Sequence, residues 1–479
     1  MYKHQNHSKF LELRKKYPTF VFKSYSYERT KTSLKAEFSF SLADEIFFHP
    51  SVQIPSRSFY DFDQLGDAAI DLLVFNIGMV ELISYWKAAC PQQLIIQAHR
   101  LDDEQIAWWK KLYFYGLGEF FYLNGIKAGQ DDFMSIISMG KISRPSTIKL
   151  SENKVLVPIG GGKDSVVSME LLKDSGLEIL PFIMNPREAS LRTIKIGGFD
   201  CEASVIVNRK LDKRLLELNE EGFLNGHTPF SALLAFVSSL TALASASRYI
   251  ALSNENSANE STVPGSNINH QYSKSFEFEQ DFGWYVQHYI HPDLYYFSFL
   301  RPLNELQIAF LFSQYPQHFL SFRSCNVESK TDSWCGHCPK CLFTYIILSP
   351  FIPTKTMEQI FNKNLLNDLA LLPILKELDG TLDVKPFECV GTPHEVNTAL
   401  WKTIQLIRKA KLPELLKGKE VKDGLEAVVF NKLLADRSAK HRAPEKLHQL
   451  LNTAFDKAIK VNRLECKDIG NYRETKNTK

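Results

Sequence analysis

The residues best suited to chemistry lie in one short stretch, residues 155–166, with the sequence VLVPIGGGKDSV. An apolar run is followed by three glycines and then by a renewed apolar pattern, which predicts a buried strand (155–159), a tight turn and a helix (165–173). Glycines let the backbone approach a ligand closely, and the amides of such a turn suit an anion. The residues that we expect at this ligand are Gly160, Gly161, Gly162, Lys163, Asp164 and Ser165.

The spacing of this loop differs from the common nucleotide-binding loops. It satisfies neither G-x-x-x-x-G-K-[ST], because Lys163 is followed by Asp164, nor G-x-G-x-x-G. It resembles the S-G-G-x-D-S loop of the PP-loop ATP pyrophosphatases, with Gly160 in place of that family's leading serine. The resemblance implies that ATP binds on an α/β sheet and is cleaved to AMP and pyrophosphate. An ordinary glycine-rich turn between a strand and a helix is the alternative interpretation.

Four of the eight cysteines form a second group, with the spacing C-x9-C-x2-C-x2-C. Two consecutive C-x-x-C steps place thiolates on tight turns, which favours a closed, structural zinc site. An iron–sulfur cluster, or a redox pair within the group, is an alternative. The surrounding residues are similar to the zinc-binding cysteines of 7-cyano-7-deazaguanine synthases, which are also PP-loop proteins, and His337 could replace one ligand. The predicted metal ligands are Cys325, Cys335, Cys338 and Cys341.

Composition limits the class of protein. The 479 residues exceed one typical domain, and 44% hydrophobic with 23% charged residues is usual for a globular protein. The net charge of +3, from 57 basic and 54 acidic residues, does not by itself indicate nucleic acid. No apolar run reaches the roughly 18 residues of a membrane-spanning helix, since serines and a threonine interrupt the richest one, 230–246. The first twenty residues lack the apolar core of a signal peptide. We therefore expect a cytoplasmic protein without membrane insertion.

The hydrophobic pattern divides the chain into three regions. We expect an α+β N-terminal domain at 1–148, a PP-loop ATP-binding domain with the cysteine group at 149–350, and a mostly helical region at 351–479. In the middle region strands and helices alternate, which predicts an α/β fold with a parallel sheet covered on both faces, of the PP-loop (adenine nucleotide alpha hydrolase-like) type. The expected strands there are 155–159, 179–183, 203–207 and 249–253, and the expected helices are 165–173, 212–218 and 229–245.

Polar residues gather where such a sheet binds its ligands. Ligands lie outside the carboxyl ends of parallel strands, and the strand expected at 249–253 is followed by a long polar connection, 254–279. Connections of this length are usually disordered or functional, and the aromatic residues in this one argue against disorder. In the N-terminal region Glu81, Lys87, Glu119 and Asn124 interrupt apolar segments, where polar groups must be paired or used.

Residues from about 76 to 391 resemble the ATP-dependent UDP-N-acetylmuramoyl-L-alanyl-L-glutamate epimerase family (MurL). The resemblance rests on ELISYWKAAC, GLGEFFYLNG, VPIGGGKDSV, NGHTPFSALLAF, SNENSANEST, NHQYSKSFEFE, YFSFLRPLNELQIA, FRSCNV, WCGHCPKCLF and KPFECVGT. Members invert the terminal L-Glu of a peptidoglycan precursor to D-Glu, consume ATP and need magnesium. The resemblance implies a small-molecule substrate, UDP-MurNAc-L-Ala-L-Glu, with ATP, Mg²⁺ and, at the cysteines, a structural Zn²⁺.

Adenylation explains why such an epimerase needs ATP. The α-proton of glutamate is far more acidic once the neighbouring carboxylate is an acyl-adenylate, so a base can remove it, an acid can return it to the other face, and water can release AMP. Proton transfer of this kind contributes about 10²–10⁴-fold. We expect the glycines and Ser165 to bind phosphate and Asp164 to bind magnesium. The candidates for proton transfer are His270, Lys274, Glu277, Glu279 and Cys389, and those for substrate binding are Asn254, Asn259 and Arg301.

Two alternative functions share either the PP-loop or the zinc site with this interpretation. A PP-loop ligase that forms an amide or nitrile, similar to 7-cyano-7-deazaguanine synthase, needs an ammonia source, and the N-terminal region lacks an obvious Cys–His glutaminase signature. A zinc-bearing tRNA-modifying protein needs a basic patch with interleaved aromatic residues. Only residues 437–446 are a weak candidate for that patch, and we expect a solvated helix end there instead. We therefore expect no nucleic-acid partner.

Overall fold

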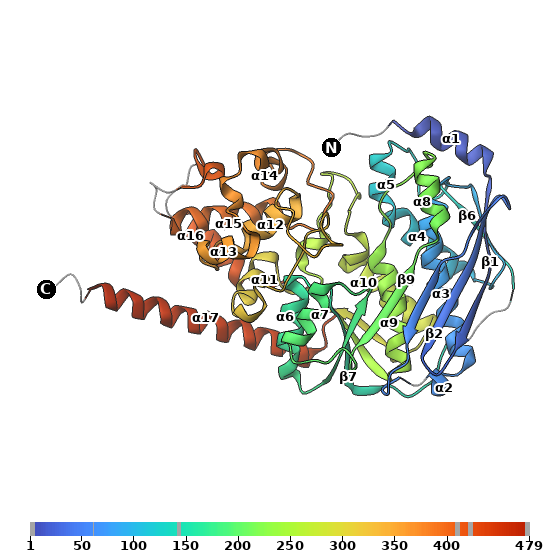
Figure 1. Cartoon of the computed structure of the whole chain (residues 1–479), viewed down its shortest axis with the longest axis horizontal. Coiled ribbons are helices and arrows are strands. Elements are labelled where there is room, and N and C mark those ends of the chain that lie inside the picture. The colour runs from blue at the N-terminus through green and yellow to red at the C-terminus, as the bar shows by residue number, and fades with distance from the viewer. Residues whose placement is uncertain (1–4, 61, 141–144, 408–411, 420–424, 475–479) are drawn as a thin grey trace.

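The computed structural model describes residues 5–60, 62–140, 145–407, 412–419 and 425–474. A single sheet of eleven strands runs through it in the order β11-β10-β7-β8-β9-β4-β2-β1-β5-β6, with β3 beside β2. Figure 1 shows the first strands at one end of the molecule and the C-terminal helices gathered at the other, with α17 (Glu445–Glu474) projecting from them. The predicted α/β class is confirmed, whereas the PP-loop identity of the fold stays a prediction.

The parallel half of the sheet is doubly wound. The chain runs from β7 to β8 and β9 on one side, then returns to the other side of β7 to form β10 and β11, and all four pairings are parallel. The strand order therefore reverses between β7 and β10, the point at which sheets of this kind bind ligands beyond their carboxyl ends. The five strands are β7 (Ser151–Pro158), β8 (Glu178–Met184), β9 (Val205–Lys210), β10 (Ser247–Leu252) and β11 (Tyr295–Ser298).

The helices of this half follow the strands as the apolar pattern predicts. The helices predicted at 165–173, 212–218 and 229–245 form within two residues of those bounds, while β11 and α7 were not predicted. The connection predicted as a polar loop to residue 279 becomes helical at Phe276, where the Ser275 hydroxyl caps the helix by accepting from the Phe278 amide at 3.1 Å. The helices are α6 (Lys163–Leu172), α7 (Glu188–Ile196), α8 (Lys213–Glu220), α9 (Phe230–Ala244), α10 (Phe276–Tyr289) and α11 (Glu305–Phe312).

The N-terminal half adds a mostly antiparallel extension to the same sheet. The alternation predicted at 32–42 is confirmed in β2, whose apolar side chains are buried. Strand β4 pairs antiparallel with β9, so the sheet continues across residue 148, and the division of the chain into three domains stays a prediction. The strands of this half are β1 (Thr19–Arg29), β2 (Ser33–Leu42), β3 (Ile46–Phe48), β4 (Ser51–Pro55), β5 (Gln93–Ile96) and β6 (Ser135–Ser138).

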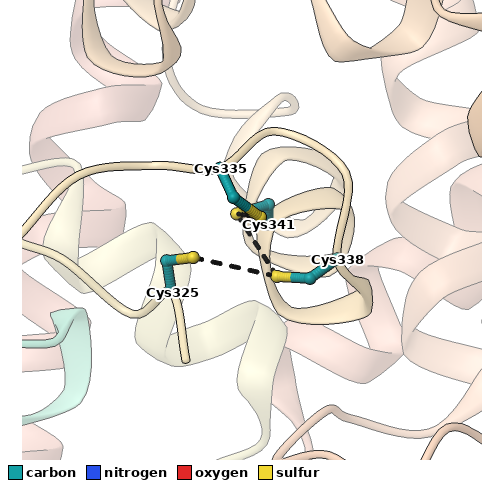
Figure 2. A group of neighbouring side chains, drawn as sticks. All are labelled: Cys325, Cys335, Cys338 and Cys341. Atoms are coloured by element: carbon teal, nitrogen blue, oxygen red, sulfur yellow. Dashed lines mark hydrogen bonds between the residues drawn. The ribbon is translucent and has the colours of Figure 1, made fainter. Parts of the chain in front are cut away.

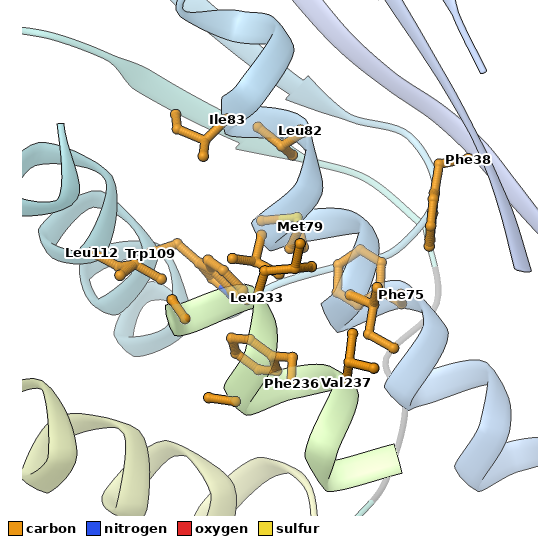
Figure 3. Close-up of a cluster of buried hydrophobic side chains, with 14 of the residues drawn as sticks. Phe38, Phe75, Met79, Leu82, Ile83, Trp109, Leu112, Leu233, Phe236 and Val237 are labelled. Carbon is orange, nitrogen blue, oxygen red and sulfur yellow. The ribbon is translucent and has the colours of Figure 1, made fainter. Parts of the chain in front are cut away.

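Helix α3 (Asp67–Trp86) is the centre of the first hydrophobic core. Figure 3 shows its Phe75 and Met79 facing α9 and α4 (Asp103–Gly116), where Trp109 stacks on Phe236 with ring centroids 5.1 Å apart. A Cβ added at Gly78 would lie 2.4 Å from the Phe22 ring, so only glycine lets α3 pack this closely on β1. Burial of these large side chains supplies most of the free energy that holds the N-terminal half together.

Helix α3 corrects one expectation. No apolar run of spanning length was expected from the sequence, and 230–246 was the richest, but α3 has 20 residues and an 18-residue window with a mean hydropathy of 1.6. It is the single helix among the described residues that could cross a membrane by length and composition. Because 89% of its apolar window is buried inside the protein, packing in the core explains its composition, and it is weak evidence for a membrane span.

The C-terminal region is helical, as predicted, with no strand among its described residues. Helix α12 packs on α11, so the second hydrophobic core joins these helices to one face of the parallel sheet. Helix α15 begins at a reciprocal capping box in which Thr392 and Glu395 each accept from the other's amide. The helices are α12 (Pro339–Leu348), α13 (Thr354–Phe361), α14 (Leu372–Leu378), α15 (Pro393–Leu406), α16 (Leu425–Ala435) and α17.

Candidate active site

A cavity of about 260 Å³ opens at the carboxyl ends of β7 and β10. It lies where the strand order reverses, as the topology leads one to expect for a ligand site. Several separate parts of the chain line it. They are the glycine loop after β7, Arg187 before α7, the first turns of α9, the segment after β10, a short helical turn before α10, the segment 323–326 with Lys340, and the segment before α15. Among the predicted site residues, those that line this cavity are Gly160, Gly162, Asp164, Ser165, Asn254, Lys274 and Cys389.

The glycine loop is built for close approach. Gly161 has φ +81°, and a Cβ there would lie 2.7 Å from the amide nitrogen of Ser190, so the position requires glycine. Gly162 is the N-cap residue of α6, and the Ser165 hydroxyl donates to its carbonyl at 2.9 Å. The amino end of α6, with the partial positive charge of its unpaired amides, therefore borders the cavity and favours an anion there.

Lys163 stabilises the glycine loop without lining the cavity. Its side chain is 3% exposed, forms ion pairs with Asp164 and with Glu305 of α11, and does not line the cavity. Burial lowers the pKa of Lys163, but the two carboxylates outweigh it and raise that pKa. Burial also raises the pKa of Glu305 to about 8. Lys163 therefore holds Asp164 at the cavity rather than contacting a ligand itself.

Two carboxylates at the cavity fit a magnesium ion. Asp164 follows β7 and Glu255 follows β10, and both line the cavity. Burial and repulsion by Asp164 raise the pKa of Glu255, against the attraction of Lys274, Lys163 and Lys340. A divalent cation would relieve this repulsion, and Mg²⁺ typically binds one or two carboxylates together with substrate phosphates.

Cys389 also lines the cavity, in contact with two lysines. The Lys274 ammonium donates to its sulfur at 3.0 Å, and the Lys340 ammonium donates to its carbonyl. Burial raises the pKa of the Cys389 thiol, but the charges of Lys274 and Lys340 and a hydrogen bond from His270 outweigh burial and lower that pKa well below its usual value. These neighbours favour the thiolate form of Cys389, and a thiolate is a competent base.

His270 connects this thiolate to a buried carboxylate. Its Nδ1 bonds to Glu119 of α5 (Gly118–Leu123), and although burial lowers the pKa of His270, its hydrogen bonds to Cys389 and Glu119 raise that pKa to about 9. The ring of His227 lies 4.4 Å from that of His270, and burial with repulsion by His270 lowers the pKa of His227 to about 3. The two neighbouring imidazoles therefore differ in pKa, with the charged form favoured at His270 and the neutral form at His227.

Three predicted residues lie elsewhere. Glu277 is exposed on α10 and pairs with Lys111 at 2.7 Å. Glu279 and Arg301 are almost fully buried and pair with each other at 3.1 Å, and neither lines the cavity. Arg301 also donates to the backbone carbonyls of Glu255, at 2.5 Å, and of Lys274, so this ion pair holds two parts of the lining in register.

Asn254 and Asn259 separate in the structure. Asn254 lines the cavity and donates to the Ser298 hydroxyl at 3.1 Å, at the end of β11. Asn259 lines a neighbouring cavity of about 520 Å³, where its side chain bonds to the Asn256 carbonyl and accepts from the Phe276 amide. The substrate-binding role predicted for each of them stays a prediction. Of the two, Asn254 lines the cavity that Cys389 also lines, and Asn259 does not.

The buried polar residues of the N-terminal region are paired, as their burial requires. Glu81 forms two hydrogen bonds to Arg209, at 2.8 and 2.9 Å. Lys87 donates to the Asn225 side chain at 2.8 Å, and Asn124 donates to the Asn225 carbonyl at 3.1 Å. Lys87 and Asn124 therefore fix the loop that carries His227, two residues further on.

The four cysteines come together as predicted. Figure 2 shows Cys325 facing Cys338 at 3.9 Å between sulfurs, Cys335 facing Cys341 at 3.7 Å, and Cys338 facing Cys341 at 3.5 Å. Four thiolates around one zinc, with Zn–S of about 2.3 Å, have sulfurs about 3.8 Å apart in a regular tetrahedron. The group therefore fits one tetrahedral ion, whereas a cluster of several irons would spread its thiolates around a larger body.

Chain neighbours of the four cysteines form part of the cavity wall. Ser324 and Asn326 flank Cys325, Lys340 lies between Cys338 and Cys341, and all three of these neighbours line the cavity. The Arg323 amide donates to the Gly161 carbonyl at 2.8 Å, which attaches this segment to the glycine loop. An ion held by the cysteines would thus fix residues that face the ligand.

Basic residues at 437–446 are engaged within the protein. This segment is a connection between α16 and the start of α17, so the helix end expected there is wrong for most of it. Arg437 pairs with Asp456 at 2.9 Å, and the Arg442 guanidinium lies 5.4 Å from the centre of the Tyr295 ring. Arg437 and Arg442 therefore contact groups within the protein, whereas a basic patch for nucleic acid would present such side chains to phosphates.

Four residues of the site were not predicted as catalytic or binding residues: Glu119, His227, Glu255 and Lys340. Glu119 gave a signal, because a carboxylate inside an apolar segment must have a partner. Glu255 also gave one, since it directly follows Asn254 after a parallel strand. Lys340 and His227 gave none, because their roles depend on contacts with residues far away in the chain.

The parallel half of the sheet is doubly wound, and the glycine loop and Cys389 with its lysines lie at the point where the strand order reverses. These features define the class of protein as an α/β enzyme. The chain belongs to the MurL family: the MurL N-terminal domain matches residues 12–299, and the MurL C-terminal domain matches residues 321–420. No solved structure matches the chain significantly.

Three curated relatives carry the same name, UDP-N-acetyl-alpha-D-muramoyl-L-alanyl-L-glutamate epimerase. The protein of Xanthomonas oryzae pv. oryzae is 36% identical over 361 residues, which cover 73% of this chain and 78% of the relative. That of Salinispora tropica is 31% identical over 388 residues, covering 80% and 84%. That of a Micromonospora species is 34% identical over 324 residues, covering 66% and 71%.

Proposed function

We propose that this protein epimerises the terminal L-Glu of UDP-MurNAc-L-Ala-L-Glu to D-Glu by ATP-dependent adenylation, releasing AMP and pyrophosphate, as a cytoplasmic step of peptidoglycan precursor synthesis. The observation that carries the proposal is that the glycine loop and the Cys389 thiolate line one cavity. An anion cradle next to a base is what adenylation followed by proton abstraction requires. The names of the three relatives support the substrate.

The first step is the activation of a carboxylate. The amides of the glycine loop and the Ser165 hydroxyl bind the phosphates of ATP at the amino end of α6. Asp164 and Glu255, which both line the cavity, would hold Mg²⁺, and the ion would supply positive charge at the phosphates. The substrate carboxylate attacks the α-phosphorus, the bond to the bridging oxygen breaks, and pyrophosphate leaves with the bonding electrons. Arg187, which lines the same cavity and donates to the Gly160 carbonyl at 2.9 Å, adds positive charge at this end.

The second step is the inversion at Cα. The Cys389 thiolate removes the α-proton of the acyl-adenylate, and the charge that develops on the acyl oxygen is stabilised by the Lys274 and Lys340 ammonium groups, which line the same cavity. A proton from solvent water is then delivered to the opposite face, the Cys389 thiol gives its own proton to solvent, and water cleaves the adenylate to D-Glu and AMP. His270 and Glu119 act through Cys389 by holding its charge.

Zinc has a structural role in this proposal. The four cysteines would bind it in a closed tetrahedral site, without an open position for substrate. The ion would hold the segment 323–326 and the first turn of α12 in place, so that Asn326 and Lys340 face the cavity. Chemistry at the glutamate is left to Cys389 and its neighbours.

The test is incubation of the pure protein with ATP, magnesium and UDP-MurNAc-L-Ala-L-Glu in deuterium oxide, followed by chiral analysis of the glutamate. We expect D-Glu with deuterium at Cα, and AMP as the nucleotide product. Glutamate that stays L and unlabelled while AMP appears only with another acceptor would refute the epimerase assignment. A new C–N bond, or modified RNA, would instead support one of the two rival functions.

A further inference from the structure

A second cavity, of about 370 Å³, lies beside the relay of Glu119 and His270. Its walls are aromatic and apolar, with Phe114, Tyr115, Phe121 and Tyr122 on one side and Ile268 on the other. Two polar side chains, Lys127 and Asn267, also line it, and both are exposed. An aromatic cavity of this size with a few polar groups at its edge is typical of a site for a planar small molecule.

Four short segments join this cavity to the thiolate. Gly118 lines it and precedes Glu119, and Ile268 lines it two residues before His270. The Tyr115 ring packs on Tyr272, two residues before Lys274, at 5.2 Å between centroids. The Tyr122 ring packs on Phe387, two residues before Cys389, at 5.5 Å.

These connections place the two cavities close together. Two residues of extended chain span at most about 7 Å, so each aromatic wall lies within a short reach of a residue of the candidate active site. A ligand long enough to fill both cavities would need only a spacer of a few groups between its two ends.

We propose that this aromatic cavity binds the uridine diphosphate end of the substrate. The uracil ring would stack on the tyrosine and phenylalanine side chains, the Asn267 amide would bond to its amide-like edge, and Lys127 would pair with the diphosphate. The sugar and alanine would then bridge to the glutamate at Cys389. The choice of a uridine nucleotide rests on the proposed function; the aromatic site itself rests on the structure.

The neighbouring polar cavity does not suit the same ligand. It is lined by three carboxylate residues, Glu260, Glu395 and Asp436, and by no lysine or arginine among the described residues. A diphosphate there would meet like charges without a cation to compensate them. The cavity at the glycine loop has the required cations, but the proposed reaction uses it for ATP.

Binding of UDP itself tests the proposal without turnover. Isothermal titration calorimetry on the full chain would compare UDP with uridine and with ADP, while a non-hydrolysable ATP analogue occupies the loop cavity. We expect UDP to bind in the presence of the analogue. Ile268→Trp, which fills the cavity, should weaken UDP and uridine about tenfold to a hundredfold, the range expected for losing a stacked base.

Lys127→Glu acts on an exposed side chain and keeps the test decisive if Ile268→Trp fails to fold. It should weaken UDP about fivefold or more and leave uridine unchanged, because only the diphosphate meets the reversed charge. Lys149→Glu, at another exposed lysine, is the matched control and should change neither.

Two results would overturn the proposal: no UDP binding beside the ATP analogue, or UDP binding that neither Ile268→Trp nor Lys127→Glu changes. Its failure is separable from that of the proposed function. UDP bound in this cavity by a protein that leaves glutamate L would refute the epimerase alone. If the protein produces deuterated D-Glu but neither substitution changes its affinity for UDP, the uridine site alone would be refuted.

Discussion

Lys274→Met should raise the pKa of the Cys389 thiol and so lower the ratio of thiolate to thiol. The Lys274 ammonium lies 3.0 Å from the sulfur, and two opposite charges at that distance attract by roughly 5 kcal/mol at an effective dielectric constant of about 20. Burial of the sulfur opposes this attraction, so only part of it favours the thiolate. If about 2 kcal/mol is lost on substitution, the ratio of thiolate to thiol falls about 30-fold at any given pH.

The assay measures the charge of the sulfur and the reaction separately. Alkylation of Cys389 by iodoacetamide, followed by mass spectrometry of its peptide, reports the thiolate as a function of pH, since the thiolate is the nucleophile. In Lys274→Met, alkylation should require a pH about 1.5 units higher, and epimerisation should fall by up to about 30-fold at pH values where the thiol predominates, while AMP formation falls less. Lys274→Arg, which keeps the positive charge, is the control and should be alkylated at low pH like the unaltered protein.

One result would refute this reasoning. If Cys389 in Lys274→Met is alkylated with the same pH dependence as in the unaltered protein, the ammonium does not hold the sulfur as a thiolate. If alkylation shifts but deuterium still enters Cα at the original rate, the thiolate exists but is not the base. The two outcomes separate an error in the electrostatics from an error in the chemistry.

Three further predictions follow from the same geometry. Cys389→Ser should lower epimerisation about 10²–10⁴-fold, as expected for a lost acid–base group, and should leave AMP formation measurable by chromatography, whereas loss of both would place Cys389 in adenylation. The pKa of His270 is raised to about 9, so the stability that its charged contacts provide is full at pH values below the ordinary histidine pKa and is lost as the pH rises through about 9. Turnover and melting temperature should both fall in that pH range. His270→Asn should remove this fall at alkaline pH from both profiles. Cys338→Ser should lower bound zinc in elemental analysis and reduce the melting temperature, and an unchanged zinc content would contradict the tetrahedral site.

Local features of the site could be predicted from sequence because they are set by short-range patterns. The strand, glycine turn and helix at 155–173 follow from apolar periodicity and from the backbone freedom that Gly161 uses at φ +81°. The cysteine group was predictable for a similar reason, since two C-x-x-C steps place thiolates on adjacent turns. In both cases the residues that matter are neighbours in the chain.

The contacts that define the thiolate were not predictable in this way. Glu119 and His270 are 151 positions apart, and Lys274 and Cys389 are 115 apart. Sequence could name His270, Lys274 and Cys389 as candidates but could not separate them from Glu277 and Glu279, which have the same chemistry and lie nearby in the chain. What excludes Glu277 and Glu279 from the cavity is the face of α10 on which each lies and how deeply each is buried, and both depend on how α10 packs.

The arrangement also argues that the candidate site needs every region of the chain. The glycine loop and Glu255 come from the parallel half of the sheet, Glu119 comes from α5 in the N-terminal half, and Cys389 comes from the segment before α15. The pairing of β4 with β9 continues the sheet from one half to the other, and α15 packs on α12 and α16 on α11 to join the third region. Because Cys389 gains its charge from Lys274, and His270 gains its charge from Glu119, no region alone could hold the thiolate that the proposed chemistry requires.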